Sequence, residues 1–97
     1  MSTYVWLVNW TDQGARSLKE TTKRAKAFKE NAEKLGVTVK EILWTMGRYD
    51  LVLLINAPND ETIRLLALAL AIGGNARTET LKAISAQEMD QILMKLP

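Results

Sequence analysis

The chain has 97 residues and a formal net charge of +2 at pH 7, and 47% of its residues are hydrophobic. This length makes one domain, residues 1–97, with a core of modest size. Cysteine and histidine are both absent, which excludes disulfides, thiolate nucleophiles, histidine bases and cysteine- or histidine-bound metals, and we expect neither a metal nor a cofactor.

No segment predicts export or membrane insertion. The first residues lack a basic region followed by an apolar run, so they do not resemble a signal peptide. The longest apolar run, Leu65 to Ile72, is too short to span a bilayer. We therefore expect a cytoplasmic protein without membrane contact.

The first third of the chain predicts a strand followed by a long helix. The β-branched and aromatic residues from Thr3 to Trp10 are typical of a strand. Thr11 or Asp12 caps a helix that runs to about Leu35, where Gly36 stops it. The apolar period of this helix predicts a buried stripe of Leu18, Thr22, Ala25, Phe28, Ala32 and Leu35.

The rest of the chain predicts a hairpin, a second helix, a fourth strand and a short last helix. The hairpin consists of strands at Val37 to Met46 and Leu51 to Ala57, joined by the turn Gly47 to Asp50. The second helix is capped by Asn59 and ends at Gly73-Gly74. The last two elements are a strand from Ala76 to Ile84 and a helix with a Ser85–Glu88 capping box and an apolar stripe of Met89, Ile92, Leu93 and Leu96.

The predicted order is β-α-β-β-α-β with a C-terminal helix, which is the split β-α-β pattern of ferredoxin-like folds. We expect an α+β fold in which both crossover helices cover one face of a four-stranded antiparallel sheet. The other face is bare in a monomer.

The predicted strands are nevertheless apolar on both sides. An antiparallel sheet with one solvated face should alternate apolar with polar residues. The helix after Asn59 is also apolar round much of its circumference, as a fully buried helix is. We therefore expect a homodimer or a higher homo-oligomer that covers the second face. In the first strand Tyr4, Trp6, Val8 and Trp10 point one way, and Val5 and Leu7 the other.

Three stretches, Asn9 to Gly14, Trp44 to Asp50 and Gly74 to Leu81, resemble the GYD domain family, named for the Gly-x-Tyr-Asp element seen here as Gly47 to Asp50. The resemblance covers nearly the whole chain. It implies a ferredoxin-like domain of the dimeric α/β-barrel group, in which two sheets pack face to face. The family carries no settled biochemical function.

A looser similarity links Met46 to Ile55 and Asn75 to Thr80 to the effector-binding domain of feast/famine, AsnC-type regulators. In those regulators small amino-acid effectors bind at subunit interfaces. No helix-turn-helix precedes the domain here, so the similarity does not imply a DNA-binding regulator.

Four polar candidates for a ligand site lie in the hairpin turn and in the strand after the second helix. Tyr49 and Asp50 place a phenol and a carboxylate at the mouth of a pocket, or they form an ordinary turn. Arg77 and Glu79 share one face of the last strand. A guanidinium there can hold a carboxylate ligand, or the two side chains can simply pair with each other.

Trp10 and Trp44 complete the candidate site, because a pocket is typically apolar with a few placed polar groups. A cluster of Trp, Asn, Tyr and Arg without metal ligands is similar to the cofactor-independent monooxygenases of the same barrel group. The alternative is that both indoles pack in the core or an interface, where aromatic side chains dominate.

The leading functional hypothesis is a self-assembling small-ligand-binding or structural module, whose ligand is a small polar molecule such as an amino acid. The alternative is a cofactor-independent enzyme, a monooxygenase or isomerase, with unidentified catalytic residues. Nucleic-acid binding is not expected. The basic first helix carries ordinary i,i+4 ion pairs, and the third strand lacks the aromatic residues on which RNA readers of this topology stack bases.

Overall fold

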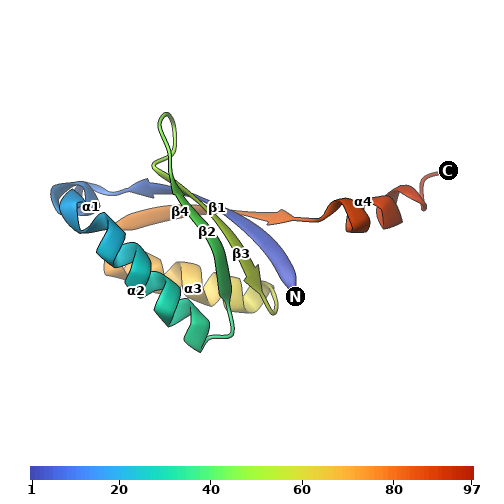
Figure 1. Ribbon diagram of the computed structural model, residues 1–97, viewed down its shortest axis with the longest axis horizontal. Coiled ribbons are helices and arrows are strands. Elements are labelled where there is room, and N and C mark those ends of the chain that lie inside the picture. The colour runs from blue at the N-terminus through green and yellow to red at the C-terminus, as the bar shows by residue number, and fades with distance from the viewer.

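Four antiparallel strands form one sheet in the computed structural model, which describes residues 1–97 (Figure 1). The strand order across the sheet is β2-β3-β1-β4, and the order of elements confirms the predicted α+β, ferredoxin-like fold. The strands are β1 (Ser2–Trp10), β2 (Thr38–Trp44), β3 (Leu51–Ala57) and β4 (Ala76–Ala83). The helices are α1 (Asp12–Arg16), the 3-10 turn η1 (Leu18–Glu20), α2 (Thr21–Lys34), α3 (Asp60–Gly73) and α4 (Ala86–Leu93).

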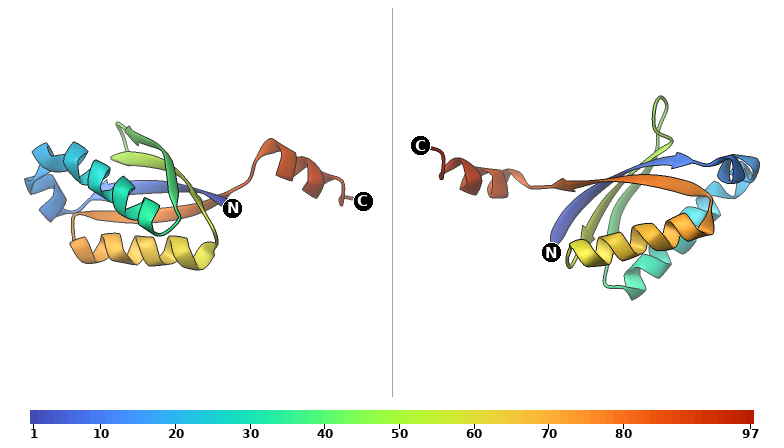
Figure 2. Two further views of the ribbon diagram at one scale, coloured as in Figure 1. Left: turned by 60° about the horizontal axis from the view of Figure 1, so that its bottom comes forward. Right: turned by 180° about the vertical axis from the view of Figure 1, so that it is seen from behind.

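Helices α2 and α3 lie on the same side of the sheet (Figure 2). The side chains of the sheet that face them form the core. Trp6 is 0% exposed and lies opposite Leu53 of β3 and Thr80 of β4. Tyr4 and Val8, two residues away on either side, are buried with it. The predicted grouping of these side chains on one side of the first strand is therefore confirmed, and that side faces the helices.

The helix predicted from residue 12 to about residue 35 is interrupted at Ser17, where α1 ends. The Arg24 guanidinium donates hydrogen bonds to the carbonyl oxygens of Ser17 (2.7 Å) and Gly14 (3.3 Å). It thus satisfies acceptors that a helix end leaves without partners. The predicted stripe is correct for Ala25, Phe28 and Ala32 and wrong for its ends, which are exposed: Leu18 lies in the break, and Thr22 and Leu35 lie at the two ends of α2.

Helix α3 begins and ends where the sequence predicts. The Asn59 side chain accepts a hydrogen bond from the Thr62 backbone N–H at 2.8 Å, and Gly74 ends the helix with a left-handed φ of 80°. The outer surface of α3 is not covered within the chain, and Ile72 is 88% exposed. We define the α3 stripe as Leu65, Leu68 and Ile72, which are all exposed.

Helix α4 lies beyond the end of β4, away from the rest of the domain (Figures 1 and 2). The Ser85 side chain accepts from the Glu88 backbone N–H, and the Glu88 carboxylate accepts from the Ser85 backbone N–H, which confirms the predicted capping box. None of the α4 residues is buried. The predicted apolar stripe of α4 therefore faces no partner in the same chain. No helix of the chain combines the length and apolar character that a membrane span requires.

Candidate functional site

The sheet face turned away from α2 and α3 has an apolar centre to which all four strands contribute. Val5 of β1 lies opposite Leu54 of β3 on one side and opposite Leu81 of β4 on the other. An antiparallel sheet that faces water should carry polar residues at these positions. We define the open face as Val5, Leu7, Leu43, Val52, Leu54 and Leu81, all of which are partly or largely exposed.

Three of the predicted site residues gather at the polar rim of the open face. The Tyr49 hydroxyl lies 3.5 Å from Glu79 Oε1, although the two residues belong to the hairpin turn and to β4. Arg77 lies on the same side of β4 as Glu79 and opposite Asn9 in the register. The Arg77 guanidinium makes no ion pair and no hydrogen bond to protein, so the predicted alternative of an Arg77–Glu79 pair is not formed.

Asp50 is engaged by the main chain rather than turned toward this rim. Its Oδ2 accepts a hydrogen bond from the Trp10 backbone N–H at 2.9 Å, and its own N–H donates to the Val8 carbonyl oxygen at 2.9 Å. The Asp50 carbonyl oxygen accepts from the Thr45 N–H at 2.9 Å. Asp50 therefore holds the hairpin turn against the end of β1. This arrangement matches the predicted alternative in which Tyr49 and Asp50 form an ordinary turn.

The two tryptophans of the predicted site lie on the helix side of the sheet. Trp10 packs against the core. Trp44 is 42% exposed, and its indole N–H donates to Thr21 Oγ1 at 3.1 Å. The six candidates are thus divided between the two faces, and only Tyr49, Arg77 and Glu79 share one surface.

The helix side holds a cavity of about 160 Å³ between the sheet and the helices. Ala25 of α2 and Ala69 and Gly73 of α3 line it opposite Trp6 and Trp10 of β1. These small helix residues leave room above the large indoles, and the spacing of Ala69 and Gly73, four apart on one helix face, is the sequence signal that could have predicted it.

Trp6 forms part of the cavity wall and contacts Phe28, with ring centroids 5.5 Å apart and the planes tilted by 42°. The Trp6 indole N–H has no hydrogen-bond acceptor, although it is shielded from solvent. A buried tryptophan N–H usually finds a partner, so this donor stands out.

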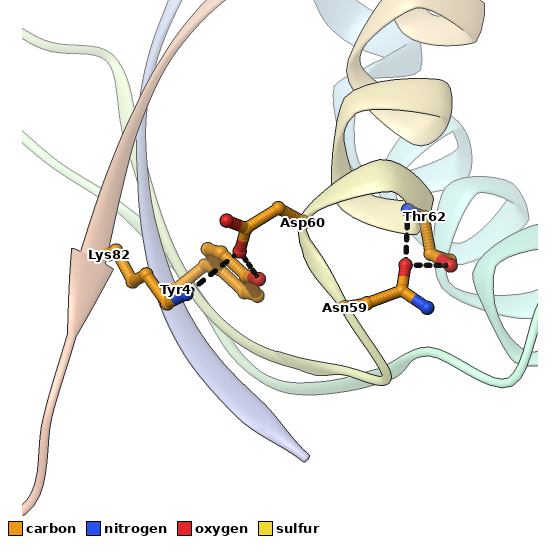
Figure 3. A network of polar contacts seen from close by, with 5 residues as sticks. All are labelled: Tyr4, Asn59, Asp60, Thr62 and Lys82. Atoms are coloured by element: carbon orange, nitrogen blue, oxygen red, sulfur yellow. Dashed lines mark hydrogen bonds and ion pairs between the residues drawn. The ribbon is translucent and has the colours of Figure 1, made fainter.

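A polar cluster ties β1, β4 and the start of α3 together (Figure 3). The Tyr4 hydroxyl donates to Asp60 Oδ1, and Lys82 Nζ lies 3.0 Å from the same oxygen. Burial and the bond to Asp60 raise the pKa of Tyr4, while the bonds from Tyr4 and Lys82 lower the pKa of Asp60. The bond to Asp60 raises the pKa of Lys82. Tyr4, Asp60 and Lys82, which we call the polar clasp, therefore bind one another, and none of them is placed as a free acid or base.

The polar clasp was not predicted, although the sequence contains the pattern for it. Lys82 and Tyr4 face each other in the β1–β4 register, and Asp60 occupies the first turn of α3. Nowhere in the chain do three or more acidic side chains gather as metal ligands would.

The chain is similar in sequence and in structure to known proteins. The profile of the GYD domain matches residues 4–93. A protein of Thermus thermophilus, named glutamine synthetase and cystathionine beta-lyase binding protein, is 32% identical over 90 residues, which cover 92% of this chain and 95% of the relative. A crystal structure of a Thermus thermophilus protein superposes with a TM-score of 0.56 at 28% identity and covers 89% of this chain and 96% of that one.

Proposed function

This chain belongs to the GYD domain family, and we propose that it is a self-assembling module that binds other proteins. The observation that carries the proposal is the apolar open face. Soluble monomers rarely expose contiguous apolar surface of this kind, and where it occurs it usually marks an interaction site. The relative named for binding two enzymes supports a role in protein interaction.

A second copy of the chain is the occupant that fits the open face best. A two-fold interface places the same surface against itself, so it must be self-complementary. The open face meets this condition, because its apolar centre can pack on its own copy while the rim carries both signs of charge, in Arg77 and Glu79. Two sheets packed this way form the barrel that the family resemblance implies.

The α4 helix supports the same occupant. Leu81 of the open face leads through Ile84 directly into α4, whose apolar stripe is exposed and too far from its own domain to be covered by it. A second copy on the open face lies next to this continuation. Pairing of the copies would thus cover both surfaces, and an interface of ordinary size buries roughly 800 Å² per partner.

The α3 stripe remains outside such a sheet-to-sheet dimer, since it lies on the outer surface of the helix layer. We assign it to the second protein. By analogy with the relative, we propose that this partner is a glutamine synthetase or a cystathionine beta-lyase of the same cell. Three aliphatic side chains on one helix face are the kind of anchors that a groove on such an enzyme can receive.

The polar rim of the open face, formed by Tyr49, Arg77 and Glu79, favours binding of a small ligand in addition to binding of proteins. Arg77 has no carboxylate partner, and Glu79 has only the 3.5 Å contact with Tyr49. An amino acid would supply a carboxylate to Arg77 and an ammonium to Glu79. Its binding should raise the melting temperature of wild type and not of Arg77→Ala, with Lys40→Ala on the edge strand as the control. An equal response of both variants would contradict this site.

Assembly is tested by sedimentation equilibrium of wild type, Leu54→Glu and Leu65→Glu. A charge at position 54 lies in the open face, whereas position 65 carries the same change on α3. Wild type and Leu65→Glu should give at least twice the 10.9 kDa chain mass, and Leu54→Glu should give the monomer with an unchanged far-UV spectrum. A monomeric wild type, or loss of assembly only in Leu65→Glu, would contradict the proposed interface.

Partner binding is tested by surface plasmon resonance with immobilised glutamine synthetase and cystathionine beta-lyase. Leu68→Glu should weaken binding about tenfold or more, as loss of a central interface anchor does. Glu61→Gln, on the same helix outside the stripe, is the control and should bind as wild type does. If wild type binds neither enzyme, the partner assignment fails, while the assembly result stands on its own.

A further inference from the structure

The cavity on the helix side has the composition of a small-molecule site. Its walls are mostly apolar, with Trp6, Trp10 and Phe28 as the aromatic surfaces. Its volume of about 160 Å³ is close to that of an engineered protein cavity, about 150 Å³, which admits benzene. The cavity lies on the opposite side of the sheet from the open face, so it is independent of the proposed assembly.

We propose that this cavity binds a small, largely apolar carboxylate, with an aromatic ring or a branched aliphatic chain against the indoles. The cavity is partly open to solvent, so a small molecule can enter it from outside. Binding sites are typically apolar concavities with a few placed polar groups, and two such groups lie here.

The first polar group is the Trp6 indole N–H. It is shielded from solvent and has no acceptor in the protein. The donor is closed to a molecule of the size of water, so a ligand oxygen reaches it only when a neighbouring side chain shifts to admit the ligand.

The second polar group is the guanidinium of Arg24, which lines the cavity at its α2 end. Arg24 Nη1 donates to the Ser17 carbonyl and hydroxyl oxygens, and Nη2 donates to the Gly14 carbonyl oxygen. All three acceptors are neutral, no carboxylate lies within ion-pair distance, and the Nε–H makes no hydrogen bond. A partly buried cation without an anion favours a ligand that carries negative charge.

The chemistry of the ligand follows from these two groups together. One carboxylate has two oxygens, which suits a guanidinium edge and a neighbouring N–H donor. The rest of the molecule must be largely apolar and compact because 11 of the 15 lining residues are hydrophobic, with Thr21 and Asn75 as polar exceptions beside Arg24. Benzoate and phenylacetate have this form, whereas toluene lacks the charge and acetate lacks the ring.

Isothermal titration calorimetry with these four compounds tests the proposal on the full chain. Benzoate or phenylacetate should bind, and toluene and acetate should bind about tenfold more weakly or not measurably. Ala25→Leu, which fills part of the cavity, should abolish binding, whereas Ala27→Leu on the exposed side of α2 should bind as wild type does. Arg24→Gln should remove the preference for the carboxylates, and Trp6→Phe should weaken binding of both of them.

Near-UV circular dichroism on each variant shows whether the core remains packed, and the Ala25 and Ala27 variants keep the test valid if the Trp6 or Arg24 variants do not fold. Failure of both carboxylates to bind wild type at millimolar concentration would overturn the proposal. So would Ala25→Leu binding as tightly as Ala27→Leu, or toluene binding as tightly as benzoate.

Discussion

Replacement of Trp6 by alanine measures how strongly the domain depends on the aromatic side of β1. Trp6 is 0% exposed and lies between the central strand partners and Phe28 of α2. Loss of a fully buried tryptophan costs about 3–5 kcal/mol, and the lower end is expected here because the lost indole N–H had no acceptor. That is a large part of the roughly 5–15 kcal/mol that holds a typical domain together.

Thermal unfolding followed by circular dichroism, at one fixed protein concentration, is the assay. For a domain of this size each kcal/mol corresponds to roughly 4–8 °C, so Trp6→Ala should melt at least about 12 °C below wild type. Trp44→Ala is the matched control, because it removes a partly exposed indole with one hydrogen bond and should cost about 1 kcal/mol. A loss for Trp6→Ala no larger than that for Trp44→Ala would refute the packing described here.

Two further predictions concern a close backbone contact and the polar clasp. A Cβ at Gly14 would collide with the backbone of Asn75, just before β4, so Gly14→Ala should lower the melting temperature sharply. A Cβ at Gly73 meets nothing, so Gly73→Ala should change the free energy of unfolding by no more than about 1 kcal/mol. Tyr4 and Lys82 lower the pKa of Asp60 below its ordinary value of 3.8, so the stability it contributes is complete above that pH and is lost as the pH falls through the lowered pKa. Asp60→Asn should therefore melt below wild type at neutral pH, and the difference should shrink in acid; a constant difference down to strongly acidic pH would contradict this origin.

The fold could be predicted because its local signals agree with one another. Alternation in β1 groups Trp6 with Tyr4 and Val8 on one side, which the structure shows to be the buried one. The caps Asn59, Gly74 and Ser85 mark helix ends that the structure confirms. The break at Ser17 could not be predicted from periodicity, because the acceptors it leaves free are satisfied by Arg24, a residue further along the chain.

The candidate site could be predicted only in part. Face alternation correctly places Arg77 and Glu79 together, but their distance from Tyr49 depends on how β4 lies beside β1, which a pattern does not contain. Asp50 resembles a ligand residue in sequence, yet it binds the backbone of Trp10. The cavity depends on which small residues of two separate helices face the same indoles, and that pairing is a property of the packed structure.

Chemical accessibility of the open face distinguishes self-assembly through that face from a solvated monomer. The native chain contains no cysteine, so Leu54→Cys and Leu65→Cys each introduce a single reporter thiol, one in the open face and one on α3. At micromolar protein concentration, with reductant removed just before labelling, a maleimide should modify the thiol at position 65 rapidly and the thiol at position 54 slowly, with the protection lost on dilution or in the presence of denaturant. Equal rapid labelling at both positions, in a folded chain at micromolar concentration, would show that the open face is solvated and would contradict self-assembly through that face.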